Sequence, residues 1–317
     1  MKVAITDYSF PDLSVEESIL QSAGHAIEAW KEKKTAAELS ALVADADAVI
    51  TQFAPVNAEV IASMQKARVI VRYGIGVDNV DLAAARAKGI PVCNVPDYCI
   101  DEVADHTLAF ILGITRQVVA NNNTLKGGKW GLATSLDQMK ALRDLSVGVV
   151  GFGRIGREVV ARLRPFRCRI LVHDPIAKAS DIQSADGIPV TMRELLSLAD
   201  VITLHCPSTP ETRGMLNSES LAKTRPGVSI INLARGDLID PQALTAALQS
   251  GHVAAAALDV FNPEPILADH PILKLNNVIV ASHIASTSVP AVRKLRETVA
   301  RLALMALNGE PLVNVVN

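Results

Sequence analysis

The stretch VGVVGFGRIGREVVARL, residues 147–163, joins a short apolar strand pattern directly to a helical pattern. Gly151, Gly153 and Gly156 within it have the spacing G-x-G-x-x-G. In a dinucleotide-binding turn the first glycine permits the tight bend, the second lets the backbone approach a pyrophosphate, and the third lets helix and strand pack closely. The free N–H groups of the helix N-terminus would then face the phosphates. By itself, the motif also fits a strand-to-helix turn that binds nothing.

An acidic residue follows this stretch at the spacing of a dinucleotide fingerprint. Asp174 ends the next apolar run, ILVHDP, roughly 20 residues beyond the glycines. A carboxylate at that position can accept hydrogen bonds from both ribose hydroxyls of a nucleotide, and its charge repels a 2′-phosphate. The sequence therefore predicts a site for NAD rather than NADP. The alternative for Asp174 alone is a turn residue that precedes Pro175.

Short apolar runs alternate with longer helical patterns along the whole chain. An early series consists of KVAIT, AVIT, RVIVR and IPVCN, and a later one of LSVGVVG, RILVHD, DVITLHC, VSIINLA, VAAAALDV and NVIVAS. These runs are continuous rather than alternating, which is typical of parallel strands covered by helices on both faces. The rhythm predicts an α/β protein with two Rossmann-like domains, each built on a parallel sheet.

Two long helical patterns indicate how the domains are connected. Residues 101–122 read as one mostly apolar helix, ended by the glycines of KGGKW, and residues 289–307 read as another. We expect the NAD-binding domain, residues 101–285 with the first of these helices, to be inserted into a split substrate domain, residues 1–100 and 286–317. The tail PLVNVVN is expected to return to the first domain as a strand.

Composition and charge argue against several other classes of protein. The 317 residues carry a net charge of −2, with 20% charged and 49% hydrophobic residues. This balance favours a packed globular chain and gives no support for a nucleic-acid or membrane partner. The basic run at residues 162–169 is interpreted as a solvated helix end. Cysteine and histidine spacings do not suggest a metal site. No apolar run reaches about 18 residues, and the start MKVAITDYSF reads as a strand rather than a signal peptide. We therefore expect a cytoplasmic protein.

Three ionisable residues follow successive strands of the later series. Arg235 comes after SIINLA, Glu264 after ALDVFNP, and His283 after NVIVAS. Ligands of open α/β sheets bind beyond the carboxyl ends of the strands, so these side chains should meet beside the cofactor. Taken singly, each has an ordinary explanation: an arginine beside a helix cap, a surface turn in NPEP, and a histidine with a structural hydrogen bond. Gly236 is expected to let the chain turn away directly after Arg235.

These residue types suit a hydride transfer between a nicotinamide and an alcohol carbon. Such a reaction moves a proton on the substrate oxygen, and histidine suits that task because its ordinary pKa is about 6.5. Glu264 paired with His283 would stabilise the imidazolium form. Arg235 offers a planar fork for a carboxylate and its neighbouring carbonyl. The reaction needs no metal.

The combined motifs resemble those of the D-isomer-specific 2-hydroxyacid dehydrogenase family over essentially the whole chain. The matching stretches are GFGRIG, LLSLADVITLHCPSTPETRGMLN, KTRPGVSIINLARGDLID, AALDVFNPEP and ASHIAS. The resemblance implies two Rossmann-like domains, a homodimer built around the first long helix, and NAD as cofactor. It also implies that Arg235 orients the substrate and that Glu264 supports His283, the proton donor or acceptor.

Motifs and resemblance together assign the remaining site residues. The cofactor would contact Thr107, Gly151, Gly153, Arg154, Ile155, Gly156, Asp174, His205, Cys206, Pro207, Thr212, Leu233, Ala234 and Asp259, the last near the nicotinamide carboxamide. In VRYGIGVDNVD, residues 71–81, Tyr73, Gly74, Ile75 and Gly76 would form a substrate loop whose backbone N–H groups hold a carboxylate; the alternative is an ordinary strand-to-helix turn. Ala285 stands where many members have glycine, and its methyl group is expected to narrow the pocket. His106 is interpreted as a packing or interface residue.

The resemblance points to the branch that contains phosphoglycerate dehydrogenases and the C-terminal-binding-protein corepressors. We therefore expect an NAD-dependent enzyme acting on a small 2-oxo or D-2-hydroxy acid of the phosphoglycerate, hydroxypyruvate or glyoxylate class. The alternative is a corepressor-like, NAD-sensing binding protein with little catalysis. The chain ends at Asn317 without long extra termini, which favours the enzyme, and feedback through a serine-sensing C-terminal module is not expected. These motifs do not encode the exact substrate or the physiological direction.

Overall fold

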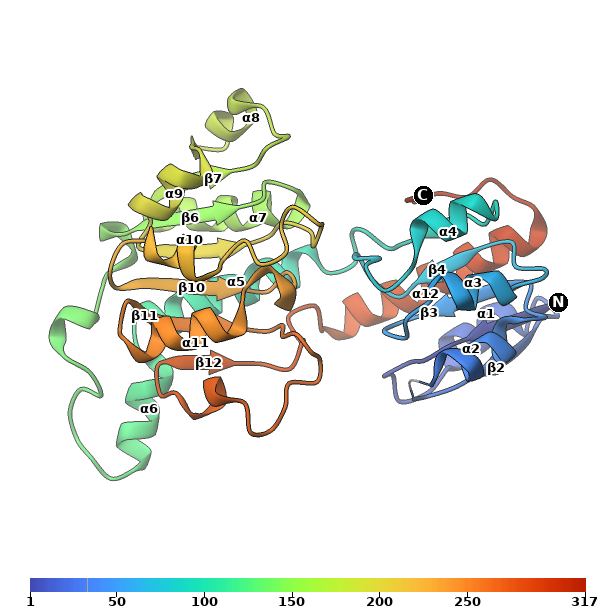
Figure 1. Cartoon of the computed structure of the whole chain (residues 1–317), viewed down its shortest axis with the longest axis horizontal. Coiled ribbons are helices and arrows are strands. Elements are labelled where there is room, and N and C mark those ends of the chain that lie inside the picture. The colour runs from blue at the N-terminus through green and yellow to red at the C-terminus, as the bar shows by residue number, and fades with distance from the viewer. Residues whose placement is uncertain (33) are drawn as a thin grey trace. The chain divides into compact units, whose positions relative to one another are not determined.

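Two compact units make up the chain in the computed structural model, which describes residues 1–32 and 34–317. Unit 1 consists of Met1–Tyr98 and Ser288–Asn317, and unit 2 of Cys99–Thr287 (Figure 1). The boundaries expected from the sequence, at residues 100/101 and 285/286, lie close to these. Each unit has a parallel sheet of its own. Within the described part of the chain, no helix combines the length and apolar character needed to cross a membrane.

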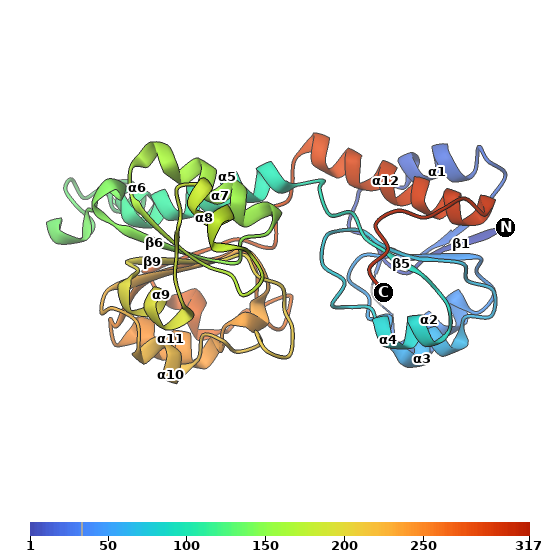
Figure 2. The same cartoon turned by 90° about the horizontal axis from the view of Figure 1, so that it is seen from above.

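The five-stranded sheet of unit 1 has the order β2-β1-β3-β4-β5, and its neighbouring strands are parallel. The strands are β1 (Lys2–Ile5), β2 (Ala26–Ala29), β3 (Ala48–Thr51), β4 (Ile70–Arg72) and β5 (Val92–Cys93). The helices are α1 (Ser14–Leu20), α2 (Ala36–Val43), α3 (Ala58–Ser63), α4 (Leu82–Ala87) and α12 (Val289–Asn308). α1 and α12 cover one face and α2, α3 and α4 the other (Figure 2). Strand β3 is buried along its whole length as a result.

The C-terminal tail returns to unit 1, as expected, but it pairs through isolated contacts rather than as a regular strand. Val316 N donates to Val92 O at 2.9 Å, and Val315 forms an antiparallel bridge with Cys93. The side chain of Asn317 extends the contact, because its Oδ1 accepts from Val92 N at 2.8 Å. The tail therefore covers the β5 edge of the sheet, which would otherwise expose unpaired backbone groups.

The seven-stranded sheet of unit 2 has the order β12-β11-β10-β9-β6-β7-β8, again with parallel neighbours. The strands are β6 (Ser146–Val150), β7 (Arg169–His173), β8 (Ile188–Pro189), β9 (Val201–Leu204), β10 (Val228–Asn232), β11 (Val253–Leu258) and β12 (Val278–Val280). The chain runs outward from β6 through β7 and β8 and then crosses to β9 on the other side of β6. Such a reversal leaves a topological switch point beside β6, where open α/β sheets bind ligands. The short strand β8 was not expected from the sequence.

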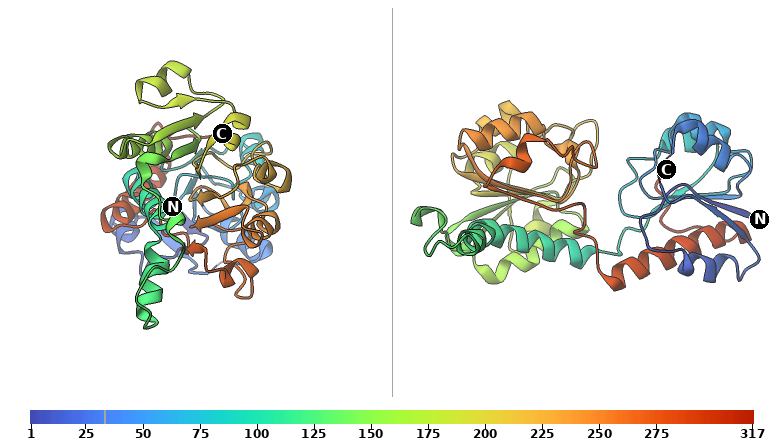
Figure 3. Two further views of the ribbon diagram at one scale, coloured as in Figure 1. Left: turned by 90° about the vertical axis from the view of Figure 1, so that its left-hand side faces the viewer. Right: turned by 90° about the horizontal axis from the view of Figure 1, so that it is seen from below.

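Helices cover both faces of the second sheet. α5 (Ile100–Thr115) and α7 (Arg154–Leu163) lie on one face, and α9 (Met192–Leu198), α10 (Ser218–Ala222) and α11 (Pro241–Gln249) lie on the other (Figure 2). The view from below shows the same layers (Figure 3). α8 (Ala179–Ser184) packs against β8 at the sheet edge. This double cover explains why the strands of this unit read as continuous apolar runs.

The helix expected at residues 101–122 is in fact two helices. α5 ends at Thr115, and α6 (Val118–Lys126) follows after Gln117, whose φ of 52° is left-handed. A residue in that conformation interrupts the helical hydrogen-bond ladder. α5 buries eight of its residues, whereas α6 buries none, so the break comes where the chain leaves the packed face of unit 2. Neither glycine nor proline marks this break in the sequence.

The basic run at residues 162–169 is not simply a solvated helix end. Arg162, in the last turn of α7, donates to Glu158 on its own helix and to Asp101 and Asp105 of α5, at 2.5–2.7 Å. Its side chain is only 25% exposed. The interpretation was wrong for this residue because its three acidic partners come partly from a distant segment. Arg162 therefore ties α7, which begins at the glycine turn, to α5.

Candidate active site

In the glycine turn between β6 and α7, Gly151 and Gly156 leave no room for a side chain, whereas Gly153 borders open space. Gly151 has a φ of 97°, and a β-carbon there would lie 2.7 Å from the carbonyl carbon of His205. A β-carbon on Gly156 would lie 2.1 Å from Gly151 O. A β-carbon on Gly153 would meet nothing within 4 Å, and Gly153 caps α7 without a side-chain hydrogen bond. The turn therefore leaves open space in front of the α7 N–H groups, where a pyrophosphate would fit.

Asp174 lies immediately after β7 and is fixed by backbone groups. Its Oδ2 accepts from Phe152 N in the glycine turn at 2.7 Å, and its Oδ1 accepts from Ile176 N and Ala177 N at 2.8 Å. Burial alone would raise the pKa of this carboxyl, but the three N–H groups outweigh it and hold the pKa below its ordinary value. Asp174 is thus a rigid, ionised acceptor beside the turn, as the predicted ribose contact requires.

The segment after β9 carries the next group of predicted cofactor contacts. Burial lowers the pKa of His205 to about 3, so its ring is neutral and pairs with Thr203 Oγ1 at 2.8 Å. Burial also raises the pKa of the Cys206 thiol to about 11, which argues against a reactive thiolate. Thr212 Oγ1 donates to Pro207 O at 2.7 Å and so closes the following loop. These residues offer backbone groups and a fixed shape rather than charge.

Thr107, a predicted cofactor contact, lies on the buried face of α5. Its side chain on α5 is fully buried, and its hydroxyl donates to Val103 O one turn earlier at 2.8 Å. The proton of the hydroxyl is therefore used within the helix, and the expected cofactor contact stays a prediction. The neighbouring His106 packs edge-on against Phe110, with ring centroids 4.5 Å apart, which agrees with the packing role expected for it.

Arg235 lies two residues beyond Leu233, in the turn after β10 and just before the short 3₁₀ helix Gly236–Leu238. Its Nη1 donates to Ala234 O at 2.7 Å. Gly236 is needed for a reason that differs from the expected turn. Its φ is not left-handed, but a β-carbon there would lie 2.0 Å from the carbonyl carbon of Phe261. Glycine therefore lets the Arg235 turn press against the segment that leads to Glu264.

Glu264 and His283 form the predicted pair. Glu264 Oε2 lies 2.8 Å from Nδ1 of His283, and Oε1 accepts from Phe261 N at 2.8 Å. Burial alone would raise the pKa of Glu264, but the hydrogen bond and charge of His283, the Phe261 N–H group and the charge of Arg235 hold it below its ordinary value. An ionised Glu264 accepts from Nδ1–H, so Nε2 is the ring atom that can exchange a proton with a substrate.

Asp259 holds the backbone of the histidine segment. His283 has a left-handed φ of 56°, and its N–H donates to Asp259 O at 2.7 Å. The carboxylate of Asp259, a residue that is 1% exposed, accepts from Ile284 N at 2.8 Å and from Ala285 N at 2.9 Å. Both oxygens thus stabilise the strained conformation at His283. The methyl group of Ala285 does not narrow an open pocket as expected, because this residue is only 4% exposed.

The predicted substrate loop lies in unit 1, after β4. Tyr73 is 2% exposed and its hydroxyl donates to Glu16 Oε1 at 3.0 Å, so the Tyr73 side chain serves the core of unit 1 and not a substrate. Gly74 has a φ of 148° and its N–H donates to Arg72 O at 2.9 Å. Ile75 and Gly76 are half-buried, and their N–H groups have no hydrogen-bond partner among the described residues. Those two amides remain available for a carboxylate.

Arg72 is a candidate residue that the sequence reasoning missed. It ends β4, is 8% exposed, and places its guanidinium so close to Gly74 that a β-carbon there would lie 1.5 Å from Nη1. The guanidinium carbon also lies 5.8 Å from the centroid of the Phe53 ring. The signal was present in RVIVR, where an arginine ends an apolar strand run just as Arg235 follows SIINLA. Arg72 therefore places a buried guanidinium beside the predicted carboxylate loop of unit 1.

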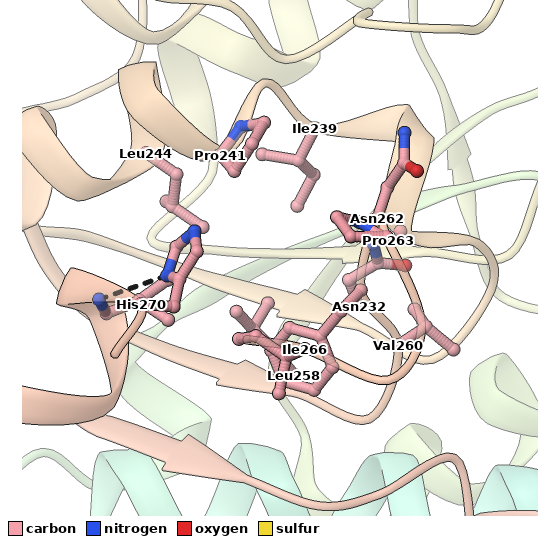
Figure 4. A pocket seen from close by; sticks show the side chains of 13 residues that line it. Asn232, Ile239, Pro241, Leu244, Leu258, Val260, Asn262, Pro263, Ile266 and His270 are labelled. Atoms are coloured by element: carbon pink, nitrogen blue, oxygen red, sulfur yellow. Dashed lines mark hydrogen bonds between the residues drawn. The ribbon is translucent and has the colours of Figure 1, made fainter. Parts of the chain in front are cut away.

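A small cavity with apolar walls adjoins the chain beside Arg235 and Glu264, since Gly236 and Pro263 are among the residues that line it (Figure 4). Side chains of Ile239, Leu244, Leu258 and Ile266 surround a cavity of about 30 Å³, beside Asn232 and Pro263. A cavity of this volume has room for about one water molecule. The cavity is therefore part of the packed core beside the candidate site and not a ligand pocket.

Comparison with known proteins connects this geometry to a family. The sequence profile described as "D-isomer specific 2-hydroxyacid dehydrogenase, NAD binding domain" matches residues 108–285. The chain belongs to the D-isomer specific 2-hydroxyacid dehydrogenase family. The matched residues lie within unit 2, so unit 2 carries an NAD-binding domain of this family. The glycine turn and Asp174 both lie in it, and the resemblance inferred from the motifs is confirmed.

Named relatives and a solved structure show how far the similarity extends. A D-3-phosphoglycerate dehydrogenase of Mycobacterium leprae is 38% identical over 304 residues, covering 95% of this chain and 57% of that protein. The chain thus spans little more than half the length of that relative. A glyoxylate reductase of Korarchaeum cryptofilum is 36% identical over 279 residues, covering 87% of this chain and 84% of that protein. The structure of D-lactate dehydrogenase from Aquifex aeolicus with NAD and lactic acid has a TM-score of 0.87 at 27% identity. The match covers 98% of this chain and 96% of that one.

Proposed function

We propose that the protein is an NAD-dependent oxidoreductase that transfers a hydride between nicotinamide and a D-2-hydroxy acid or the matching 2-oxo acid. The observation that carries this proposal is the Glu264–His283 pair, 2.8 Å apart, beside the arginine turn that presses on the same loop. An ionised carboxylate, a histidine and an arginine are the groups that this reaction needs. The names of the relatives support the same class of reaction.

Each residue has a separate task in the reducing direction. Bound NADH would supply the hydride to the carbonyl carbon. Arg235 holds the carboxylate and polarises the adjacent carbonyl through its planar fork. His283 gives the proton on Nε2 to the carbonyl oxygen as that oxygen gains charge, and Glu264 stabilises the imidazolium before the transfer. In the oxidising direction His283 takes the hydroxyl proton back.

The cofactor preference is proposed to be NAD over NADP. The fixed, ionised Asp174 supports this, because a 2′-phosphate beside it would meet a like charge with little freedom to move away. The substrate is proposed to be a small oxo acid of the phosphoglycerate, hydroxypyruvate or glyoxylate class. The N–H groups of Ile75 and Gly76, with the guanidinium of Arg72, support a role for unit 1 in holding its anionic group.

A substrate panel tests the proposed function. Purified protein is assayed with NADH and with NADPH against glyoxylate, hydroxypyruvate, pyruvate and phosphohydroxypyruvate, and each pair is ranked by kcat/KM. The proposal expects saturable NADH oxidation with at least one oxo acid. If NADH binds but no oxo acid is reduced, the corepressor-like alternative, in which NAD is only sensed, replaces the enzyme.

We also propose that the protein forms a homodimer, through α6 and the segment that follows it. Large apolar side chains there are exposed: Val118, Val119, Leu125, Trp130, Leu132 and Leu136. Trp130 is 93% exposed, which is unusual for so large a side chain on a monomer. Light scattering should give twice the monomer mass, and Trp130→Glu should shift it toward the monomer. Ile176→Glu, at another exposed apolar residue, is the matched control; a monomeric wild type would contradict the proposal.

A further inference from the structure

Asn232, the last residue of β10, closes the turn that carries Arg235. It is 1% exposed, and its Oδ1 accepts from Ala234 N at 3.0 Å while its Nδ2 donates to Arg235 O at 2.8 Å. One side-chain amide thus bonds the backbone on both sides of the Cα atom from which the Arg235 side chain departs. Asparagine forms such local bonds readily, because it has a donor and an acceptor on one planar group.

Other bonds of the same turn also hold the backbone at Arg235, because Leu238 N donates to Arg235 O at 3.3 Å. Arg235 belongs to no strand, and it precedes the 3₁₀ helix Gly236–Leu238 without a side-chain cap. Its Nη1 donates to the adjacent Ala234 O at 2.7 Å. Asn232 thus helps to set the backbone geometry from which the guanidinium departs. Aspartate would place an acceptor against Arg235 O, where Asn232 has a donor.

A neighbouring strand uses the same arrangement for the other reacting residue. Asn232 pairs in register with Leu258 of β11, and the next residue, Asp259, donates its N–H to Asn232 O at 3.0 Å. Asp259 uses its buried carboxylate to hold the backbone after His283. Adjacent strand ends thus present two buried polar side chains: that of Asn232 bonds the backbone of Ala234 and Arg235, and that of Asp259 bonds the two residues after His283. Their pairing in the sheet fixes the spacing between the two turns.

We infer that Asn232 is a positioning residue that acts through Arg235, setting the guanidinium at the angle that binds the substrate carboxylate. This inference rests on the proposed function, in which Arg235 anchors the oxo acid. A positioning role predicts that changes at Asn232 affect the oxo acid more than the cofactor, and that they matter only while Arg235 is present.

A double-mutant cycle tests the inference, using the best oxo acid of the panel. Asn232→Asp should raise KM for the oxo acid roughly tenfold, which corresponds to a loss of about 1.4 kcal/mol in binding free energy. The change in kcat should be smaller, and Kd for NADH should stay the same. In a protein that already carries Arg235→Ala, the same substitution should raise KM for the oxo acid by less than about twofold. Asn277→Asp, which removes a side-chain bond to Ala254 O in the same unit, is the matched control and should leave both constants near wild type.

Different outcomes separate this inference from the proposed function. Equal effects of Asn232→Asp with and without Arg235, or a weakened Kd for NADH, would show a general structural role and overturn the inference. If Asn232→Asp does not fold, Asn232→Ser, which keeps one short hydrogen-bonding group, takes its place in the same cycle. A wild-type protein that neither reduces nor binds any oxo acid would remove the proposed function, and the inference with it. An active wild type with an additive cycle would remove the inference alone.

Discussion

Nδ1 of His283 lies 2.8 Å from Oε2 of Glu264, and the other oxygen of that carboxylate accepts from Phe261 N. The Phe261 backbone also packs against Gly236, the residue after Arg235. One short segment, residues 261–264, therefore connects the acid–base pair to the arginine turn. This connection gives the proposed site a rigid frame within unit 2.

Removing the charge of Glu264 should reduce turnover. Glu264→Gln keeps the shape of the side chain but no longer stabilises an imidazolium, and its amide can hold the ring in the wrong tautomer. We expect kcat to fall about 10²- to 10³-fold, with a smaller change in KM. Steady-state kinetics with NADH and the best oxo acid measures this. Glu297→Gln, in an exposed pair with Arg293, is the control, and a fully active Glu264→Gln variant would exclude the paired role.

The two reaction directions should respond oppositely to pH. Reduction needs the proton on His283 and should decline as pH rises, whereas oxidation needs the unprotonated ring and should decline as pH falls. The pKa of Glu264 is held below its ordinary value, so the pair is intact above that ordinary value and is lost only as pH falls through the lowered pKa. Reduction should therefore persist near about pH 5. Profiles of kcat that run parallel in both directions would contradict this assignment.

The charge of Asp174 should set the cofactor preference. Asp174→Asn removes the charge and keeps an oxygen for Ile176 N and Ala177 N, but its amide nitrogen loses the bond from Phe152 N, so the readout is the ratio between the two cofactors and not the absolute rate. The preference for NADH over NADPH, as a ratio of kcat/KM values, should fall roughly tenfold or more, because the repulsion of the 2′-phosphate is lost. Asp186→Asn, which removes a surface partner of Arg164, is the control. An unchanged ratio would mean that Asp174 does not distinguish a ribose 2′-hydroxyl from a 2′-phosphate.

A buried histidine in unit 1 should make stability depend on pH. His25 is 8% exposed, and neither ring nitrogen has a hydrogen-bond partner among the described residues. Burial, with the charge of the chain N-terminus, lowers the pKa of His25, and the opposing charge of Asp47 does not offset this. The unfolded chain thus binds the proton more readily, and stability should be lost as pH falls below the ordinary value of about 6.5.

Replacing that histidine provides the test. His25→Leu should raise the free energy of unfolding by about 1 kcal/mol at pH 8, because no polar group is then left unpaired, and by more at pH 5. Urea unfolding at the two pH values measures the difference. His252→Leu, at a ring that is hydrogen-bonded to Leu221 O, should instead destabilise the protein. If His25→Leu raises the free energy of unfolding by the same amount at both pH values, protonation of His25 is not the cause of the pH dependence.

The sequence predicted those features that depend on local chemistry and strand order. The glycine turn, the parallel sheets and the Glu264–His283 pair follow from spacing and from the rule that ligands lie beyond strand ends. Features that depend on tertiary surroundings were missed. No local signal breaks the helix at Gln117, and none shows that the Tyr73 hydroxyl points at Glu16. Asn232 reads as an ordinary strand end until its two bonds are seen.

The chirality of the product tests the central claim most directly. Hydroxypyruvate is incubated with NADH and either wild-type protein or His283→Asn, and the glycerate formed is resolved on a chiral column. The account predicts that wild-type protein forms only D-glycerate, in step with NADH oxidation, and that His283→Asn forms it at least about 10²-fold more slowly. Racemic or L-glycerate, or an equal rate without His283, would contradict it.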